Sequence, residues 1–199
     1  MPELASTNDS NKKFLILDLN GVLLGSAFTR RTRNRYQNFR AHCFEFLKVC
    51  LSCFDVVVWS SKLSMSTQMN ELLEQKLLFV WDQSRCTVIE TRLREHPDKN
   101  VMFKELKHMC EEYKSYNSSN TILVDDSPYK SFLNSVSTPS QLILMLYMCM
   151  FSQIRRLDLE RDFVRYLKKL ADADNVQEFR KQNPFGQSSI TEGSEDWNF

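Results

Sequence analysis

Three apolar segments of the chain each end in polar residues that could bind a metal ion and a phosphate group. The three pairs are Asp18 and Asn20, Ser60 and Ser61, and Asp125 and Asp126. Carboxylates held close together repel one another unless a cation neutralises them, and oxygen ligands suit a hard divalent cation such as Mg²⁺. A serine hydroxyl can donate a hydrogen bond to phosphate oxygens. The pattern therefore predicts a Mg²⁺ and phosphate site, provided that the fold brings the three segments together.

Such a site also needs a lysine to offset the remaining negative charge. We favour Lys104, which lies at the start of a predicted helix, over Lys62 and Lys107.

The segments that must position these residues are predicted strands. Residues 13–19 and 54–60 are apolar runs typical of strands buried on both faces. Two more strands are predicted at 77–81 and 121–125, and helices at 39–53, 64–76 and 101–114. This alternation predicts an α/β fold with a doubly wound, mainly parallel sheet flanked by helices. In such sheets ligands bind beyond the carboxyl ends of the strands, where the polar pairs lie.

The rest of the chain is expected to complete one domain over residues 13–187. Residues 25–40 are predicted to form a polar, arginine-rich loop, and 154–171 and 174–182 to form helices, the second with Asp174 as its N-cap. The apolar stretch 138–151 either supplies an edge strand or is a divergent segment that leaves an apolar patch. Residues 1–12 and the acidic tail 188–199 are expected to be disordered.

Composition excludes several classes of function. The chain has 199 residues, a net charge of +1 and only four glycines. It contains no glycine-rich dinucleotide or P-loop motif, and its charge balance argues against direct nucleic-acid binding. The longest apolar run, 142–151, is about half of a membrane span. Without a secretory or transit signature, we expect a nuclear or cytoplasmic monomer, with a mitochondrial location disfavoured.

Four ordered motifs resemble the RNA polymerase II carboxy-terminal-domain phosphatase-like (NLI-interacting-factor-like) family of the haloacid dehalogenase superfamily. They are Asp18-Leu-Asn20-Gly, Trp59-Ser60-Ser61-Lys62, Phe103-Lys104-Glu-Leu106 and Val124-Asp125-Asp126-Ser-Pro128. Trp81-Asp-Gln-Ser-Arg-Cys86 and Asn183-Pro-Phe-Gly-Gln187 are similar to the plant branch, whose first motif often reads Asp-x-Asn-Gly. The resemblance implies a three-layer sandwich with only a small insertion between the second and third motifs.

The resemblance also implies roles for these residues. Asp18 would be the nucleophile that forms an aspartyl-phosphate. Asp18, Asp126 and the main-chain carbonyl of Asn20 would hold Mg²⁺, with Asp125 adjacent. Ser60 would bind the phosphoryl oxygens, Ser61 is a second candidate for substrate binding, and Lys104 would offset charge in the transition state.

One position departs from the family pattern: the acid/base aspartate is Asn20. Asparagine can neither protonate the leaving oxygen nor deprotonate water, and that proton transfer is typically worth roughly 10²–10⁴-fold. We therefore expect a protein phosphatase-like domain for phosphoserine or phosphothreonine, with weak or lost activity. The competing interpretation is that Asn20-Gly21 only forms a tight turn.

The expected partner is a phosphorylated protein or peptide. Arg30 and Arg31 belong to a basic cluster that could grip it, although such a cluster can also be an ordinary solvated loop. The alternative function is a non-catalytic peptide-binding module, either a pseudophosphatase scaffold or a protein similar to the mitochondrial presequence translocase receptor.

Overall fold

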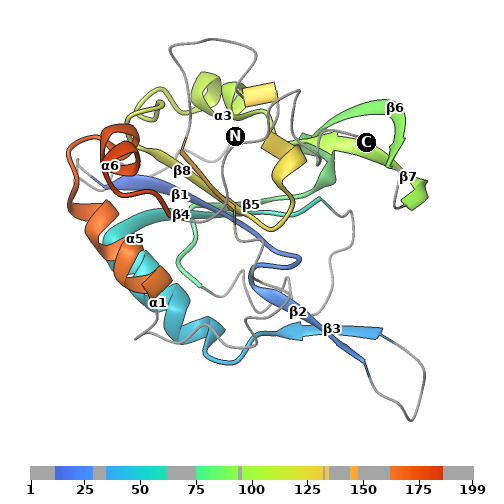
Figure 1. Cartoon of the computed structure of the whole chain (residues 1–199), viewed down its shortest axis with the longest axis horizontal. Helices are drawn as coiled ribbons and strands as arrows, with labels where there is room; N and C mark the ends of the chain where they lie inside the picture. Colours follow the sequence, from blue (N-terminus) through green and yellow to red (C-terminus); the bar gives the residue numbers. More distant parts are fainter. Residues whose placement is uncertain are drawn as a thin grey trace.

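A five-stranded parallel sheet forms the centre of the protein (Figure 1). The computed structural model describes residues 12–28, 35–61, 75–93, 96–131, 133–134, 144–147 and 162–185. The strand order is β5-β4-β1-β8-β9. The strands are β1 (Lys13–Asp18), β4 (Phe54–Trp59), β5 (Phe79–Trp81), β8 (Thr121–Asp125) and β9 (Leu144–Tyr147). All four pairings are parallel, which confirms the predicted α/β fold.

Both faces of β1 are buried because its aliphatic side chains point alternately to opposite sides. Leu15 and Leu17 join one hydrophobic cluster, whereas Phe14 and Ile16 join another on the opposite face. This strand lies in the middle of the sheet, between β4 and β8. A continuous apolar run was therefore the correct sequence signature for the centre of the fold.

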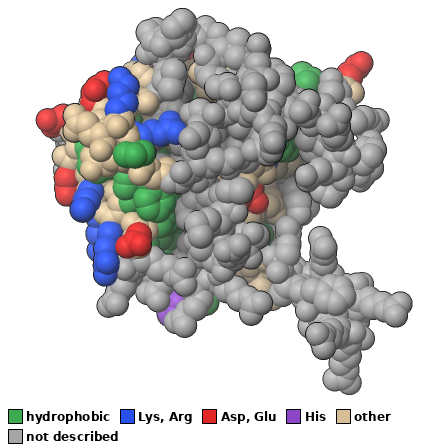
Figure 2. All heavy atoms as spheres, viewed as in Figure 1, with side chains coloured by type: hydrophobic (Ala, Val, Ile, Leu, Met, Phe, Trp, Pro, Cys, Tyr) green, Lys and Arg blue, Asp and Glu red, His purple; other side chains and the backbone are tan. Residues whose placement is uncertain are grey.

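Helices cover both faces of the sheet. The first cluster includes residues of α1 (Cys43–Cys53), α5 (Asp162–Asp172) and α6 (Val176–Gln182). The second cluster contains Leu106 and Met109 of α3 (Leu106–Glu112). The outward faces of α5 and α6 are polar, and Figure 2 shows acidic and basic side chains interspersed on the side of the molecule where Figure 1 places these helices. The predicted three-layer arrangement is thus observed.

Two regions carry strands that the sequence analysis did not predict. The expected loop 25–40 contains an antiparallel hairpin of β2 (Leu24–Phe28) and β3 (Arg35–Phe39). A second hairpin, β6 (Thr87–Leu93) with β7 (His96–Phe103), follows the single turn η1 (Gln83–Arg85) and lies between the second and third motifs. The helix predicted at 101–114 begins only at Leu106, because the residues up to Phe103 pair with β6.

The apolar stretch 138–151 supplies an edge strand, since β9 pairs with β8 in parallel. This outcome supports the first of the two interpretations for its residues 144–147. Near the C-terminal end, α6 has Asn175 and not Asp174 as its N-cap, because the Asn175 side chain accepts hydrogen bonds from the N–H groups of Gln177 and Glu178. The described part of the predicted helix 154–171 is observed as α5, over Asp162–Asp172, and residues 154–161 lie outside the described residues.

Several predictions fall outside the described residues. These include most of the helix at 64–76, residues 1–11 of the N-terminus and the whole tail 188–199. Within the described part of the chain, the helices are too short or too polar to cross a bilayer.

The packing of α5 against the sheet leads to a stability prediction. Leu170 is fully buried in the first cluster, whereas the neighbouring Lys169 is exposed. We expect Leu170→Ala to lower the free energy of unfolding by about 2–5 kcal/mol, because it removes buried methyl groups and leaves a cavity. Urea denaturation measures this effect. Lys169→Ala is the matched control and should stay within about 0.5 kcal/mol of the parent; equal effects would mean that α5 is not part of the core.

Candidate active site

Three carboxylates meet at the carboxyl ends of neighbouring strands. Asp18 is the last residue of β1, Asp125 is the last residue of β8, and Asp126 follows directly. The parallel register pairs Leu17 with Val124, which brings these ends together. Each carboxylate has an oxygen within 4.8 Å of an oxygen of the others. Asp18 and Asp125 are fully buried, whereas Asp126 keeps about a third of its side chain exposed.

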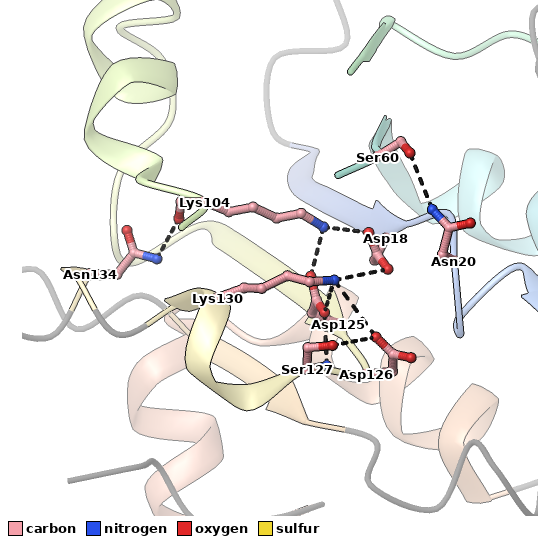
Figure 3. A network of polar contacts seen from close by, with 9 residues as sticks. All are labelled: Asp18, Asn20, Ser60, Lys104, Asp125, Asp126, Ser127, Lys130 and Asn134. Carbon is pink, nitrogen blue, oxygen red and sulfur yellow. Dashed lines mark hydrogen bonds and ion pairs between the residues drawn. The ribbon is translucent and has the colours of Figure 1, made fainter. Parts of the chain in front are cut away.

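Lys104 provides a buried ammonium group between two of these carboxylates. Its Nζ donates to Asp18 Oδ1 and Asp125 Oδ2, each at 2.6 Å (Figure 3). The side chain is fully buried. Of the other lysines considered, Lys107 is exposed and pairs with Glu105, and Lys62 lies outside the described residues. The structure therefore places the favoured lysine at the predicted carboxylates.

The main chain around Lys104 is fixed from both sides. Its N–H donates to the carbonyl of Lys130 at 2.7 Å. Its carbonyl accepts a hydrogen bond from Asn134 Nδ2 at 2.7 Å, and Asn134 Oδ1 accepts one from the N–H of Leu106 at 2.8 Å. Two segments that follow β8 thus hold the turn between β7 and α3, which sets the direction of the Lys104 side chain.

Lys130 is a second ammonium group at the site, and the sequence analysis missed it. It lies on the short 3-10 turn η2 (Pro128–Ser131) and is almost completely buried. Its Nζ is 3.0 Å from Asp125 Oδ1, 3.4 Å from Asp18 Oδ2 and 3.8 Å from Asp126 Oδ1. A signal was present in the sequence: Lys130 follows Asp126 by four residues, so a helical turn after the aspartate pair brings the two together.

Burial and charge shift the pKa values of the carboxyl groups in different directions. Burial and the nearby Asp125 raise the pKa of Asp18. Burial also acts to raise the pKa of Asp125, but Lys104 and Lys130 outweigh it and the pKa lies below its ordinary value. Burial raises the pKa of Asp126 to about 6, although Lys130 opposes the shift. The pKa values of Asp18 and Asp126 are thus raised, whereas that of Asp125 is lowered.

Asn20 and Ser60 form the other side of the site. Asn20 Nδ2 donates to Ser60 Oγ at 3.3 Å, so the two side chains point toward each other (Figure 3). Ser60 directly follows β4, and its N–H donates to the carbonyl of Trp81 at 2.8 Å. Ser61 is the next residue along the chain and is half-buried. Arg30 and Arg31 lie outside the described residues, so their predicted role stays a prediction.

The Asn20-Gly21 pair does form a turn. Gly21 has φ of +88°, and its carbonyl accepts a hydrogen bond from Arg40 Nη2 at 2.7 Å. A Cβ atom at Gly21 would lie 1.7 Å from Asp126 Oδ2. A tight turn at Asn20-Gly21 is therefore compatible with a place for Asn20 in the site. The turn directs the Asn20 side chain toward Ser60 and leaves space for the Asp126 side chain.

Comparison with known proteins identifies relatives of this chain. Residues 13–177 match the family described as NLI interacting factor-like phosphatase. An uncharacterized FCP1 homology domain-containing protein from Schizosaccharomyces pombe is 30% identical over 200 aligned positions, which cover 88% of this chain and 78% of the relative.

Two solved structures are similar to part of the chain. One is a Vibrio cholerae protein assigned as a 3-deoxy-D-manno-octulosonate 8-phosphate phosphatase, with a TM-score of 0.38 and 11% identity over 59% of this chain and 57% of that one. The other is a Legionella pneumophila protein assigned as a hydrolase of the HAD superfamily, with a TM-score of 0.37 and 13% identity over 59% and 56%. Likenesses of this size carry no conclusion about the chemistry of this chain.

The close approach at Gly21 leads to a second prediction. We expect Gly21→Ala to lower the free energy of unfolding by about 1–3 kcal/mol, because alanine resists a positive φ and its Cβ collides with Asp126. Urea denaturation measures the change. Gly25→Ala is the matched control, since its Cβ would meet its nearest atom, Arg40 Cγ, at an ordinary 3.6 Å. Equal stability of the two variants would contradict the assignment of strain to Gly21.

Proposed function

The chain belongs to the NLI interacting factor-like phosphatase family, and from this premise we propose that it is a Mg²⁺-dependent phosphoserine or phosphothreonine phosphatase-like domain with reduced turnover. The observation that carries the proposal is the buried Asp18 carboxylate, which is held by Lys104 and faces Asp126 at the carboxyl edge of the sheet. Its substrate would be a phosphorylated protein or peptide in the nucleus or cytoplasm.

The residues at this edge fit a divalent metal ion. Three carboxylates carry three negative charges, and the two lysines offset two of them. Oxygen ligands in this number suit Mg²⁺, which is commonly bound through one or two carboxylates together with substrate phosphate oxygens. Asp18, Asp126 and the carbonyl of Asn20 would hold it, with Asp125 adjacent. When bound, the ion would neutralise charge on the phosphoryl oxygens.

The chain's own residues account for the transfer step. An Asp18 oxygen would attack phosphorus, so that an aspartyl O–P bond forms while the bond to the seryl oxygen breaks. Lys104 keeps Asp18 oriented through the 2.6 Å contact and offsets the charge that spreads over the phosphoryl oxygens. Ser60 would donate its hydroxyl hydrogen to one of these oxygens.

Asn20 is the residue that limits turnover. A seryl alkoxide is a poor leaving group and needs a proton, which an amide cannot supply. The Asn20 amide instead donates to Ser60 Oγ. Activated aryl phosphates suffer less from this change, because their leaving groups hardly need protonation.

Restoring the acid tests this account. We expect Asn20→Asp to raise the turnover of a phosphoserine peptide by roughly 10²–10⁴-fold and to raise aryl phosphate turnover much less, since it restores the missing proton transfer. Steady-state kinetics on both substrates measures the split. Asp18→Asn is the control and should abolish both activities. An equal gain on the two substrates would contradict the proposed role of position 20, and peptide mass spectrometry must first exclude deamidation of Asn20-Gly21.

The pKa of Asp126 leads to a prediction about pH and metal binding. Because burial raises this pKa to about 6, the metal-free carboxyl group carries a proton at lower pH that Mg²⁺ must displace. The apparent affinity for Mg²⁺ should therefore fall as pH falls through about 6, approaching roughly tenfold per pH unit. Calorimetric titration between about pH 5 and pH 7.5 measures the slope. Asp126→Asn should bind more weakly and lose most of the slope; a parent affinity independent of pH would contradict the assignment.

The alternative function, a phosphopeptide-binding scaffold, is favoured by the same residue, Asn20. The two functions differ in whether binding is followed by hydrolysis.

We expect Arg30→Glu with Arg31→Glu to weaken phosphopeptide binding at least severalfold, since charge reversal repels the peptide's phosphate, while aryl phosphate turnover stays unchanged. Fluorescence anisotropy with a labelled phosphopeptide measures the binding. Lys168→Glu with Lys169→Glu, on the exposed face of α5, is the charge-matched control. Unchanged binding would assign the basic cluster to a solvated loop.

A further inference from the structure

The ammonium group of Lys130 lies against the same three carboxylates that would hold the metal ion. Its Nζ is within 3.8 Å of an oxygen of Asp18, Asp125 and Asp126 (Figure 3). Lys104 differs from it, because among the described ion pairs Lys104 contacts Asp18 and Asp125 but not Asp126. Of the two ammonium groups, only that of Lys130 is in contact with all three.

The two lysines together occupy every carboxylate oxygen of the buried aspartates. Lys104 takes Asp18 Oδ1 and Asp125 Oδ2, whereas Lys130 takes Asp18 Oδ2 and Asp125 Oδ1. Lys130 also lies beside one oxygen of each of the two aspartates that would hold a divalent cation, Asp18 Oδ2 and Asp126 Oδ1. Two cations in contact also repel each other strongly where little water screens them. The ion and the Lys130 ammonium group therefore compete for one position.

We propose that Lys130 is a built-in counterion that competes with Mg²⁺ for the three carboxylates and must turn away before the ion binds. This inference rests on the proposed function, since it presupposes that Mg²⁺ uses the three carboxylates. Formal charge fits the exchange: three ionised carboxylates and two charged lysines sum to −1, and replacing the Lys130 charge by Mg²⁺ brings the sum to zero.

The structure also indicates which lysine moves. Lys104 is fully buried, and hydrogen bonds to both its N–H and its carbonyl hold its main chain. The Lys130 side chain is itself only 6% exposed, but it lies beside the partly exposed Asp126 and reaches the site by a flexible four-carbon stem. The Lys130 carbonyl accepts the hydrogen bond from Lys104, so only its side chain has to leave.

Metal titration of matched variants tests the exchange. We expect Lys130→Met to bind Mg²⁺ roughly tenfold more tightly, or more, than the parent in calorimetric titration, because the ion no longer displaces a charged group. Lys104→Met removes the same charge from Asp18 and Asp125 and should give a smaller gain. Equal or weaker binding by Lys130→Met, or a gain matched by Lys104→Met, would overturn the proposal. Binding by neither the parent nor Lys130→Met would overturn the Mg²⁺ site of the proposed function, and the competition with it.

A measurement on the parent protein covers the case in which these variants fail to fold. Reductive methylation followed by peptide mass spectrometry reports how accessible each lysine amine is. We expect saturating Mg²⁺ to raise the labelling rate of Lys130 severalfold, while buried Lys104 stays protected and exposed Lys107 stays reactive. An unchanged or lower rate for Lys130, under conditions where calorimetry shows Mg²⁺ to be bound, would overturn the proposal.

Discussion

The site depends on one constraint: charged groups can be buried at the edge of the sheet only if opposite charges are buried with them. Asp18 and Asp125 have no exposed side-chain surface, and neither does Lys104. An isolated buried carboxylate would take up a proton, and an isolated buried ammonium group would lose one. Hydrogen bonds of 2.6 Å from one lysine to both aspartates make their joint burial possible.

The surrounding strands and turns fix the positions of the charged aspartate and lysine side chains. Parallel pairing of β1 with β8 sets the spacing of the aspartates. Lys104 lies on the turn after β7, and Lys130 lies on η2. The two turns are joined by a hydrogen bond from the Lys104 N–H to the Lys130 carbonyl. On the opposite side, Gly21 leaves space for Asp126 that any side chain would fill. This geometry holds the proposed nucleophile in place, because Lys104 orients the buried Asp18 carboxyl group through a 2.6 Å hydrogen bond.

Sequence reasoning succeeded where structure is local or set by buried runs. The central strands β1, β4 and β8 and the candidate residues at their ends were predictable because a strand buried on both faces leaves an unbroken apolar run. The β2–β3 hairpin was not, since its polar and arginine-rich sequence carries little periodicity and pairing joins residues as far apart as Leu24 and Phe39. The late start of α3 had the same cause, because pairing with β6 keeps the residues up to Phe103 in a strand.

The amino-acid sequence by itself determined the central α/β sheet, the family and the identity of Asp18, Asn20, Ser60, Lys104, Asp125 and Asp126 as candidates, because these depend on residue type and spacing. Only the tertiary structure decided that Lys130 contacts all three carboxylates and that Asn20 is hydrogen-bonded to Ser60. The physical reason is that these contacts join segments whose relative positions depend on how the turns after β1, β4 and β8 are packed. Residue types determine which chemical groups could interact, whereas tertiary packing determines which of these groups are in contact.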